Sequence, residues 1–204
     1  MTSTPGSAGP TAAPTSPRPE HGPLVRRFGP VQRWAHRTTA LLMLVCVATA
    51  ACLYVPQLAE LVGRRYLVVT VHQWAGLLLP VPVLVALLSR DFRADLRRLN
   101  RLGSAKFHRG QKLYAAWIAG AVVVMLGTGL LMWFTDLAGL MWRTSATFVH
   151  DWLALAIGIV LAGHIGKALN NPGARRGMRT GHVERHWAER EHPRWLDEEE
   201  RRNQ

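Results

Sequence analysis

The sequence predicts an all-α integral membrane protein, a four-helix bundle with both termini on the cytoplasmic side. Two observations predict this fold. The apolar residues gather in four blocks, each close to the roughly 20 residues that a helix needs to cross a bilayer. The lysines and arginines lie almost entirely in three of the segments outside these blocks. Four such blocks in a chain of 204 residues argue against the alternative, the buried helices of a soluble domain.

The four predicted spans end at residues that stop an apolar helix. The first ends before Pro56, and the third closes near Trp133, an aromatic residue of the kind found at membrane interfaces. Pro80 and Pro82 lie inside the second span, where we expect them to kink the helix rather than end it. The fourth stops before the sequence Asn-Asn-Pro-Gly at 170–173. The predicted spans are residues 38–55, 66–89, 113–134 and 146–168.

The chain divides into three parts by composition. Residues 1–25 are rich in Thr, Ser, Pro, Gly and Ala and lack the apolar stretch of a signal peptide, so we expect a disordered cytoplasmic tail. Residues 26–170 form the four-helix transmembrane domain. Residues 171–204 are expected to be a cytoplasmic C-terminal tail, with a solvated and frayed end after Trp195.

Positive charge predicts the orientation of the helices. The segment up to Arg37 carries five lysines and arginines, the loop from Arg90 to Lys112 carries eight, and the segment from Lys167 onward carries nine. The two remaining loops hold three together. Because basic residues concentrate on the cytoplasmic side of membrane proteins, both termini and the central loop are predicted to be cytoplasmic. This placement accounts for the net charge of +12 without a nucleic-acid partner.

Four of the nine histidines lie in or at the ends of the predicted spans, where an ionisable side chain is a functional hypothesis. Helix direction places His36 and His164 at the cytoplasmic level and His72 and His150 at the outer level. His150 and His164 are 14 residues apart, which places them within about 40° of one helix face and roughly 21 Å apart along the axis. Imidazole pairs at two depths suit two b-type haems, each with two neutral histidines as axial ligands of the iron.

Other interpretations of these residues were weighed. A single membrane histidine is more often a packing residue, but four at two levels are less easily explained in that way. A di-metal site is a weaker alternative because no span contains Glu-x-x-His. The absence of Cys-x-x-Cys-His excludes covalently attached haem, and Cys46 and Cys52 are interpreted as buried apolar residues. The histidines interpreted as surface groups are His21, His182, His186 and His192.

Two further sets of residues are compatible with haem and with simpler roles. Arginines and a lysine near the span ends suit haem propionates as well as lipid headgroups: Arg33, Arg37 and Lys167 on the cytoplasmic side, and Arg64, Arg65 and Arg143 outside. Glycines in the spans allow close approach of a porphyrin or, more simply, of another helix. These glycines are Gly76, Gly120, Gly127, Gly129, Gly158 and Gly163.

Four groups of residues resemble the di-haem cytochrome b subunits of membrane-bound formate dehydrogenases. Residues 33–36, Arg-Trp-Ala-His, open the first helix, and residues 106–112, Lys-Phe-His-Arg-Gly-Gln-Lys, open the third. The third group is His150 and His164 with their spacing. The fourth is Arg-Gly-Met-Arg-Thr-Gly at 176–181, followed by Trp-Ala at 187–188 and His-Pro-Arg-Trp at 192–195. The resemblance extends from about residue 26 to residue 195.

The resemblance implies a function. Subunits of that family accept electrons from an iron–sulfur partner on the outer face and pass them through the outer and then the inner haem to a quinone on the cytoplasmic side. It implies that His108, Gly110 and Gln111 lie at the quinone, although the family usually has Asn where this chain has His108. A histidine also donates a hydrogen bond. The implied haem ligands are His36, His72, His150 and His164.

The resemblance also implies partners. The chain has no molybdenum or iron–sulfur motif, so we expect no primary catalytic site beyond quinone reduction. The expected partners are an iron–sulfur subunit and a molybdenum, tungsten or nickel–iron catalytic subunit, in a bacterial cytoplasmic membrane. Cytochrome b subunits of nickel–iron hydrogenases and of other molybdenum enzymes share the pattern, which leaves the partner, the quinone and the direction of electron flow open.

Two functions of other kinds compete with this hypothesis. One is a haem-free anchor that only holds a partner at the membrane, which has no need of four intramembrane histidines. The other is a stand-alone quinol oxidase or transmembrane reductase that acts on a soluble acceptor. A haem absorbance spectrum separates the first from a redox role, and an adjacent iron–sulfur gene would argue against the second.

Overall fold

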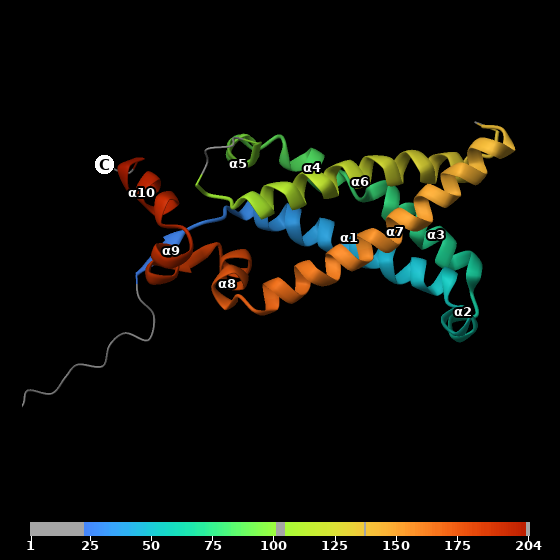
Figure 1. Ribbon diagram of the computed structural model, residues 1–204, viewed down its shortest axis with the longest axis horizontal. Helices are drawn as coiled ribbons and strands as arrows, with labels where there is room; N and C mark the ends of the chain where they lie inside the picture. Colours follow the sequence, from blue (N-terminus) through green and yellow to red (C-terminus); the bar gives the residue numbers. More distant parts are fainter. Residues whose placement is uncertain (1–22, 101–104, 137, 203–204) are drawn as a thin grey trace, which may run out of the picture.

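Four long helical rods form the body of the protein (Figure 1). The computed structural model describes residues 23–100, 105–136 and 138–202. Within these residues, four helical segments are long and apolar enough to cross a membrane, which confirms the predicted four-helix fold. Residues 1–22, most of the predicted disordered tail, lie outside the described residues. The rods are α1 (Pro30–Tyr54), α3 (Arg65–Leu78) with α4 (Val81–Ala86), α6 (Arg109–Trp133) and α7 (Leu140–Leu169).

Three of the rods begin four or more residues before the predicted apolar stretches. Helix α1 starts at Pro30, where proline is favoured because the first helical N–H needs no partner. Helix α6 starts at Arg109 and α7 at Leu140. The predicted spans contain only residues that are apolar enough for the hydrocarbon core of a membrane. Backbone hydrogen bonding continues each helix beyond them into the polar boundary of the membrane.

The second rod is interrupted where its two prolines lie. Helix α3 ends at Leu78 and α4 begins at Val81. Leu79 and Pro80 keep right-handed helical dihedral angles, so the chain continues as a rod. The hydrogen-bond ladder changes there, because Pro80 and Pro82 have no N–H, and the Leu79 N–H donates to the Gly76 carbonyl at 3.2 Å. The expected kink is therefore a short break in the ladder of one membrane-spanning rod.

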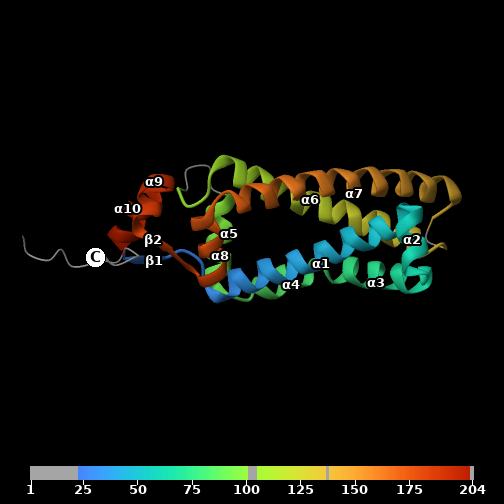
Figure 2. The ribbon, with the colours of Figure 1, turned by 90° about the horizontal axis from the view of Figure 1, so that it is seen from below.

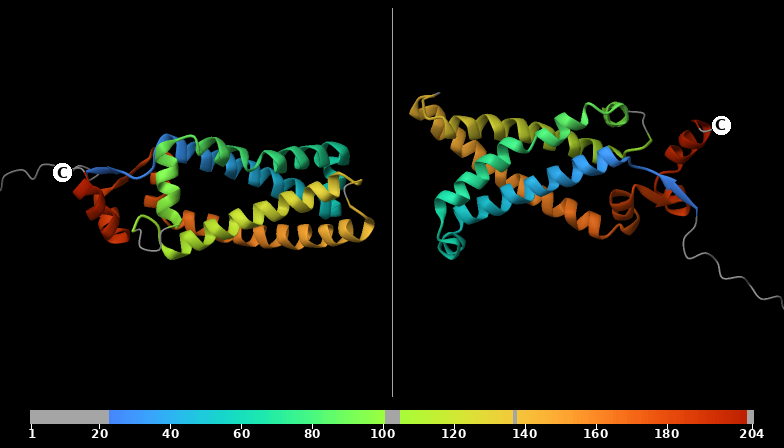
Figure 3. Two further views of the ribbon diagram at one scale, coloured as in Figure 1. Left: turned by 90° about the horizontal axis from the view of Figure 1, so that it is seen from above. Right: turned by 180° about the vertical axis from the view of Figure 1, so that it is seen from behind.

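The rods form two hairpins that lie in two layers (Figure 2). Helix α1 packs along α3 and α4, and α6 packs along α7. The hairpins cross (Figure 3), and at the crossing one buried residue from each rod contributes to a central apolar layer. These residues are Met43, Leu79, Ala121 and Ile157.

The two ends of the bundle differ. Helix α2 (Pro56–Val62) connects the first two rods at one end, which we call the opposite end. Helix α5 (Arg90–Asn100) lies across the other end (Figure 3). We call this second end the basic end, because it carries most of the lysines and arginines. The predicted cytoplasmic position of the basic end stays a prediction.

A small folded module lies beyond the basic end (Figure 1). Strand β1 (Leu24–Arg26) pairs antiparallel with β2 (His182–Glu184), with Val25 opposite Val183. Helices α8 (Pro172–Thr180), α9 (Arg185–Glu191) and α10 (Pro193–Arg202) complete what we call the basic-end module. The prediction of a frayed end after Trp195 is wrong for the residues up to Arg202. These residues form the rest of α10, and Leu196 is buried. The core of the module consists of Val183, Trp187, Ala188, Trp195 and Leu196.

Two glycines allow segments of the basic-end module to pack closely. Gly181 ends α8 with φ +90°, a left-handed conformation that side chains rarely adopt. A Cβ at Gly181 would lie 2.7 Å from the Phe28 carbonyl oxygen. At Gly173 a Cβ would lie 2.4 Å from the Trp187 ring, so the indole packs directly on the backbone of α8.

Candidate haem sites

The structure brings the four intramembrane histidines together in two pairs. His72 on α3 lies beside His150 on α7, with ring centroids 6.3 Å apart and an interplanar angle of 68°. His36 on α1 lies beside His164 on α7, also at 6.3 Å, with an angle of 48°. We call these the opposite-end pair and the basic-end pair. They are the pairs that helix direction predicted.

The spacing within each pair fits one metal ion between the rings. An imidazole nitrogen binds a transition metal at about 2 Å and the ring centroid lies about 1 Å farther, so two axial imidazoles have centroids about 6 Å apart. Both observed separations are 6.3 Å. Two imidazoles on opposite sides of one iron are a haem donor set. The residues present therefore fit a bis-histidine haem at each pair.

Threonines from neighbouring helices contact both rings of the opposite-end pair. The Thr49 hydroxyl on α1 lies 2.8 Å from Nδ1 of His72. The Thr128 hydroxyl on α6 lies 2.9 Å from Nδ1 of His150. Both hydroxyls contact Nδ1, so Nε2 of each ring is not used for the contact with threonine.

The basic-end pair has different surroundings. Within the described residues, neither His36 nor His164 makes a hydrogen bond through its ring. The Tyr114 ring of α6 instead stacks on His164, with centroids 4.7 Å apart and planes within 11° of parallel. A stacking contact of this kind holds the plane of a ring but fixes neither its tautomer nor its rotation within that plane.

The residues that the resemblance assigns to a quinone lie at the start of α6. The side chains of His108 and Gln111 cap this helix reciprocally, and the His108 N–H donates to the Gln111 side-chain oxygen at 3.0 Å. A Cβ on Gly110 would meet no heavy atom of the described residues within 4 Å. Gly110 and Tyr114 are four residues apart and lie on one helix face. Tyr114 therefore connects this helix start with His164 of the basic-end pair.

His192 is buried, with 5% of its surface exposed, so its interpretation as a surface group is wrong. Arg27 donates from Nη2 to Nε2 of His192 at 2.9 Å and to the Lys106 carbonyl at 3.0 Å. The guanidinium lies over the Trp195 ring, 4.7 Å from its centroid. Burial, with the nearby Arg27 and His108, lowers the pKa of His192 to about 3. His192 is therefore neutral, and its ring stacks on that of His108 at 4.2 Å.

Two residues considered for haem propionates have another partner. Arg33 donates from Nη1 to the Arg179 carbonyl at 3.0 Å, and Arg37 donates from Nη2 to the same oxygen at 2.7 Å. Arg179 lies in the last turn of α8, where cations favourably meet the free carbonyl groups of a helix. These contacts attach the basic-end module to the first rod.

Tight helix packing does not explain most of the glycines in the spans. A Cβ at Gly129 would lie 3.4 Å from the His150 ring, an ordinary close contact at the opposite-end pair. At the others a Cβ would meet no heavy atom of the described residues within 4 Å. These others are Gly76, Gly120, Gly127, Gly158 and Gly163.

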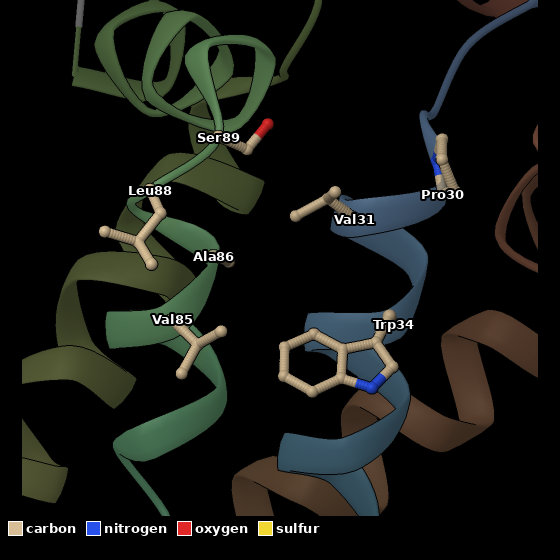
Figure 4. A pocket seen from close by; sticks show the side chains of 7 residues that line it. All are labelled: Pro30, Val31, Trp34, Val85, Ala86, Leu88 and Ser89. Carbon is tan, nitrogen blue, oxygen red and sulfur yellow. The ribbon is translucent and has the colours of Figure 1, made fainter.

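An apolar groove of about 500 Å³ lies between α1 and the end of α4. In Figure 4, Val31 and Trp34 extend from α1 toward Val85. Trp34 precedes His36 by two residues, so the two side chains point about 160° apart around the helix. The groove and the basic-end pair therefore lie on different sides of α1, and we assign no ligand to the groove.

Helices that span a membrane and hold imidazole pairs at two levels define a class of protein, the membrane-bound b-type cytochromes. The chain belongs to the prokaryotic cytochrome b561 family, which matches residues 27–180. It is a multi-pass bacterial membrane protein that binds haem b and transfers electrons.

Individual relatives agree with this assignment. The chain is 25% identical over 190 residues to the formate dehydrogenase cytochrome b556 subunit of Haemophilus influenzae, an alignment that covers 82% of this chain and 80% of that protein. It is 28% identical over 99 residues to the nitrate-inducible formate dehydrogenase cytochrome b556(Fdn) subunit of Escherichia coli K12, covering 47% of this chain and 46% of the relative. The predicted resemblance to formate dehydrogenase cytochrome b subunits is confirmed.

Sequence reasoning missed three residues that contact the histidine pairs. Thr49 and Thr128 place hydroxyl groups inside apolar runs. Thr49 precedes His72 by 23 residues and Thr128 precedes His150 by 22 residues. That recurring spacing is a signal that the sequence offered. Tyr114 had a weaker signal, because it follows the predicted quinone residue Gly110 by one helical turn.

Proposed function

We propose that this cytochrome is the quinone-linked, di-haem membrane subunit of an oxidoreductase complex. The observation that carries the proposal is the presence of two histidine pairs at separate levels, each with 6.3 Å between ring centroids. His72 and His150 would hold one iron, and His36 and His164 the other. Each haem, when bound, supplies a one-electron carrier.

The distribution of charge supports the orientation in this proposal. Lysine and arginine concentrate at the basic end, which supports a cytoplasmic position for that end. The opposite-end pair then lies near the outer face, where an iron–sulfur partner would deliver electrons. The relatives are named as formate dehydrogenase subunits. By analogy, a molybdenum, tungsten or nickel–iron catalytic subunit would complete the complex.

The quinone site of this proposal lies at the start of α6. Gln111 accepts a hydrogen bond through its side-chain oxygen, so its NH₂ group stays able to donate to a quinone carbonyl. His108 is exposed, whereas His192 beneath it is held neutral by Arg27 and by burial. His108 is therefore the histidine of this stacked pair that is accessible to a bound quinone and can donate a hydrogen bond to it. Tyr114 would connect the quinone with the basic-end pair.

Haem content tests the first part of the proposal. A pyridine haemochrome assay on the purified protein should find two b haems per chain, released without covalent attachment. A content of zero would support the haem-free anchor. A content of one would leave one of the histidine pairs without an iron.

Electron transfer to quinone tests the second part. His108→Ala and Gln111→Ala should leave reduction of both haems by dithionite unchanged and slow their reoxidation by a quinone about 10-fold or more, since general acid–base groups contribute at least this much. The matched control is His186→Ala, which removes an exposed histidine of the neighbouring basic-end module. If reoxidation keeps the unmutated rate in both variants, the quinone binds elsewhere.

A further inference from the structure

Each hairpin of the bundle repeats one contact. In the first hairpin, Thr49 of α1 contacts His72 of the following rod, 23 residues later. In the second, Thr128 of α6 contacts His150 of α7, 22 residues later. Both contacts join a threonine hydroxyl to Nδ1 and differ by 0.1 Å in length, 2.8 against 2.9 Å. The same device thus occurs twice, once for each ring of the opposite-end pair.

The other hydrogen bonds of the threonines indicate the direction of this contact. A hydroxyl has one proton to donate and accepts through its oxygen. The Thr49 hydroxyl donates to the Val45 carbonyl at 2.7 Å, and Thr128 donates to the Val124 carbonyl at 2.8 Å. Both oxygens are thereby left to accept a hydrogen bond from an N–H of the histidine ring.

The tautomer of each ring follows from this direction. A neutral imidazole has one N–H, and the other nitrogen has a lone pair. When Nδ1–H donates to threonine, Nε2 is the nitrogen able to bind a metal. Within the described residues the basic-end pair has no hydrogen bond of this kind, so its tautomer is not fixed in this way.

We propose that Thr49 and Thr128 are positioning residues of the opposite-end pair. They hold His72 and His150 with the proton on Nδ1 and the lone pair of Nε2 directed toward the shared iron. This inference rests on the proposed function, because it requires a haem at that pair. A ligating histidine whose N–H donates a hydrogen bond is a stronger electron donor to its metal. The two threonines therefore favour the oxidised iron at this level and lower its reduction potential below the value that the same site would have without them.

A lowered potential at the opposite end favours electron transfer from the His72–His150 level toward the His36–His164 level. The threonines achieve this without adding a charge inside the membrane, where an unpaired charge is costly.

The test uses valine, which has the shape of threonine but no hydrogen-bond acceptor. In the full-length holoprotein, Thr49→Val and Thr128→Val should raise the potential of one of the two haems in a redox titration and leave the other unchanged. We expect that haem to be released about 10-fold more readily, as with other partners of metal ligands. Thr49→Ser and Thr128→Ser restore the hydroxyl and should restore both properties.

The chain provides a matched control. Thr70 lies on the same helix as His72 and donates to the Tyr66 carbonyl at 2.9 Å, and within the part of the chain that the structure describes it makes no hydrogen bond to a histidine. Thr70→Val should therefore leave both potentials unchanged. The inference is overturned if the valine variants keep both wild-type potentials, shift both haems equally, or match the effect of Thr70→Val.

A second measurement keeps the inference separate from the proposed function. In haem-free protein, ¹⁵N NMR of the histidine rings should show His72 and His150 protonated on Nδ1, and Thr49→Val should change the His72 signal. Wild-type protein that takes up no haem would contradict the proposed function, while this NMR result decides the positioning role alone. Rings protonated on Nε2 would overturn it, including in the case where a valine variant does not fold.

Discussion

The two histidine pairs have the same separation between rings but different surroundings. At the opposite end, both rings are held by threonine hydroxyls that belong to the rods themselves. At the basic end, Tyr114 stacks on one ring, and the rod α1, which carries His36, also carries the arginines that bind the basic-end module. A directional hydrogen bond fixes the rotation of a ring, whereas a stacking contact allows it to adjust.

The contrast extends to where the contacts come from in the sequence. At the opposite-end pair, each threonine belongs to the same hairpin as the histidine that it contacts, 22 or 23 residues away. The basic end is instead completed by residues from the two ends of the chain, with Arg27 and His192 separated by 165 residues. The basic-end surroundings thus depend on a separate folded module, and this gives three ways to test the comparison.

Removing one ligand from each pair should have the largest effect. His150→Ala should eliminate the opposite-end haem and His164→Ala the basic-end haem, because one imidazole cannot provide two axial ligands. Each variant should contain about one haem per chain and retain one of the two components in a redox titration. Loss of both haems from either variant, with helicity by circular dichroism unchanged, would contradict the assignment of two independent levels.

Acidification should destabilise the basic-end module through His192. His192 has a pKa of about 3 in the folded protein, while an unfolded histidine titrates near 6.5. Between these values the unfolded module binds the proton and the folded one does not, so its unfolding free energy falls as the pH decreases from about 6.5 to about 3. The unfolding equilibrium constant should rise by up to about 10-fold per pH unit.

Amide hydrogen exchange of α9 and α10, corrected for intrinsic exchange rates, measures this change. The variant His192→Gln keeps an acceptor for Arg27 but does not titrate, so its exchange should depend less steeply on pH. Amides around the opposite-end pair in α3 serve as the internal reference. An equal pH dependence in wild type and His192→Gln would assign the effect to another group.

Replacing Tyr114 should have the smallest effect. Aromatic stacking contributes about 0.5–1.5 kcal/mol beyond burial, so Tyr114→Leu should weaken retention of the basic-end haem by up to about 10-fold. Tyr114→Phe keeps the stack and should behave like wild type. Separate redox titration of the two haems provides the measurement. A shift of the opposite-end component would show that the two sites are not independently supported.

The sequence predicted the features that depend on one helix or on its direction. Apolar length located the four spans, and alternating direction paired His36 with His164 and His72 with His150. The structure brings these rings together. The positions of the helix ends were less accurate, because polar residues such as Arg109 extend a helix without changing its apolar length.

The features that were missed depend on contacts between distant segments. His192 appears polar and outside any span, and only its position beneath Arg27 and beside His108 makes it a core residue. The segment after Trp195 is highly charged, yet one face of α10 carries Trp195 and Leu196 into the module core. No local pattern reports the antiparallel pairing of β1 with β2, whose strands are three residues long.

The central apolar layer lies between the two histidine pairs, so part of any transmembrane voltage falls between them. Residues 150 and 164 are 14 positions apart on α7, so the pairs lie roughly 21 Å apart along the axis, or about two-thirds of a hydrocarbon core about 30 Å thick. Moving one elementary charge across the whole membrane involves about 2.3 kcal/mol per 100 mV. In the proposed orientation, an electron that travels inward past Met43, Leu79, Ala121 and Ile157 therefore works against about 1.5 kcal/mol for each 100 mV of transmembrane voltage. Under the proposed function, the transmembrane voltage therefore opposes further electron transfer across this layer. The rate of electron transfer through the protein would then depend on that voltage.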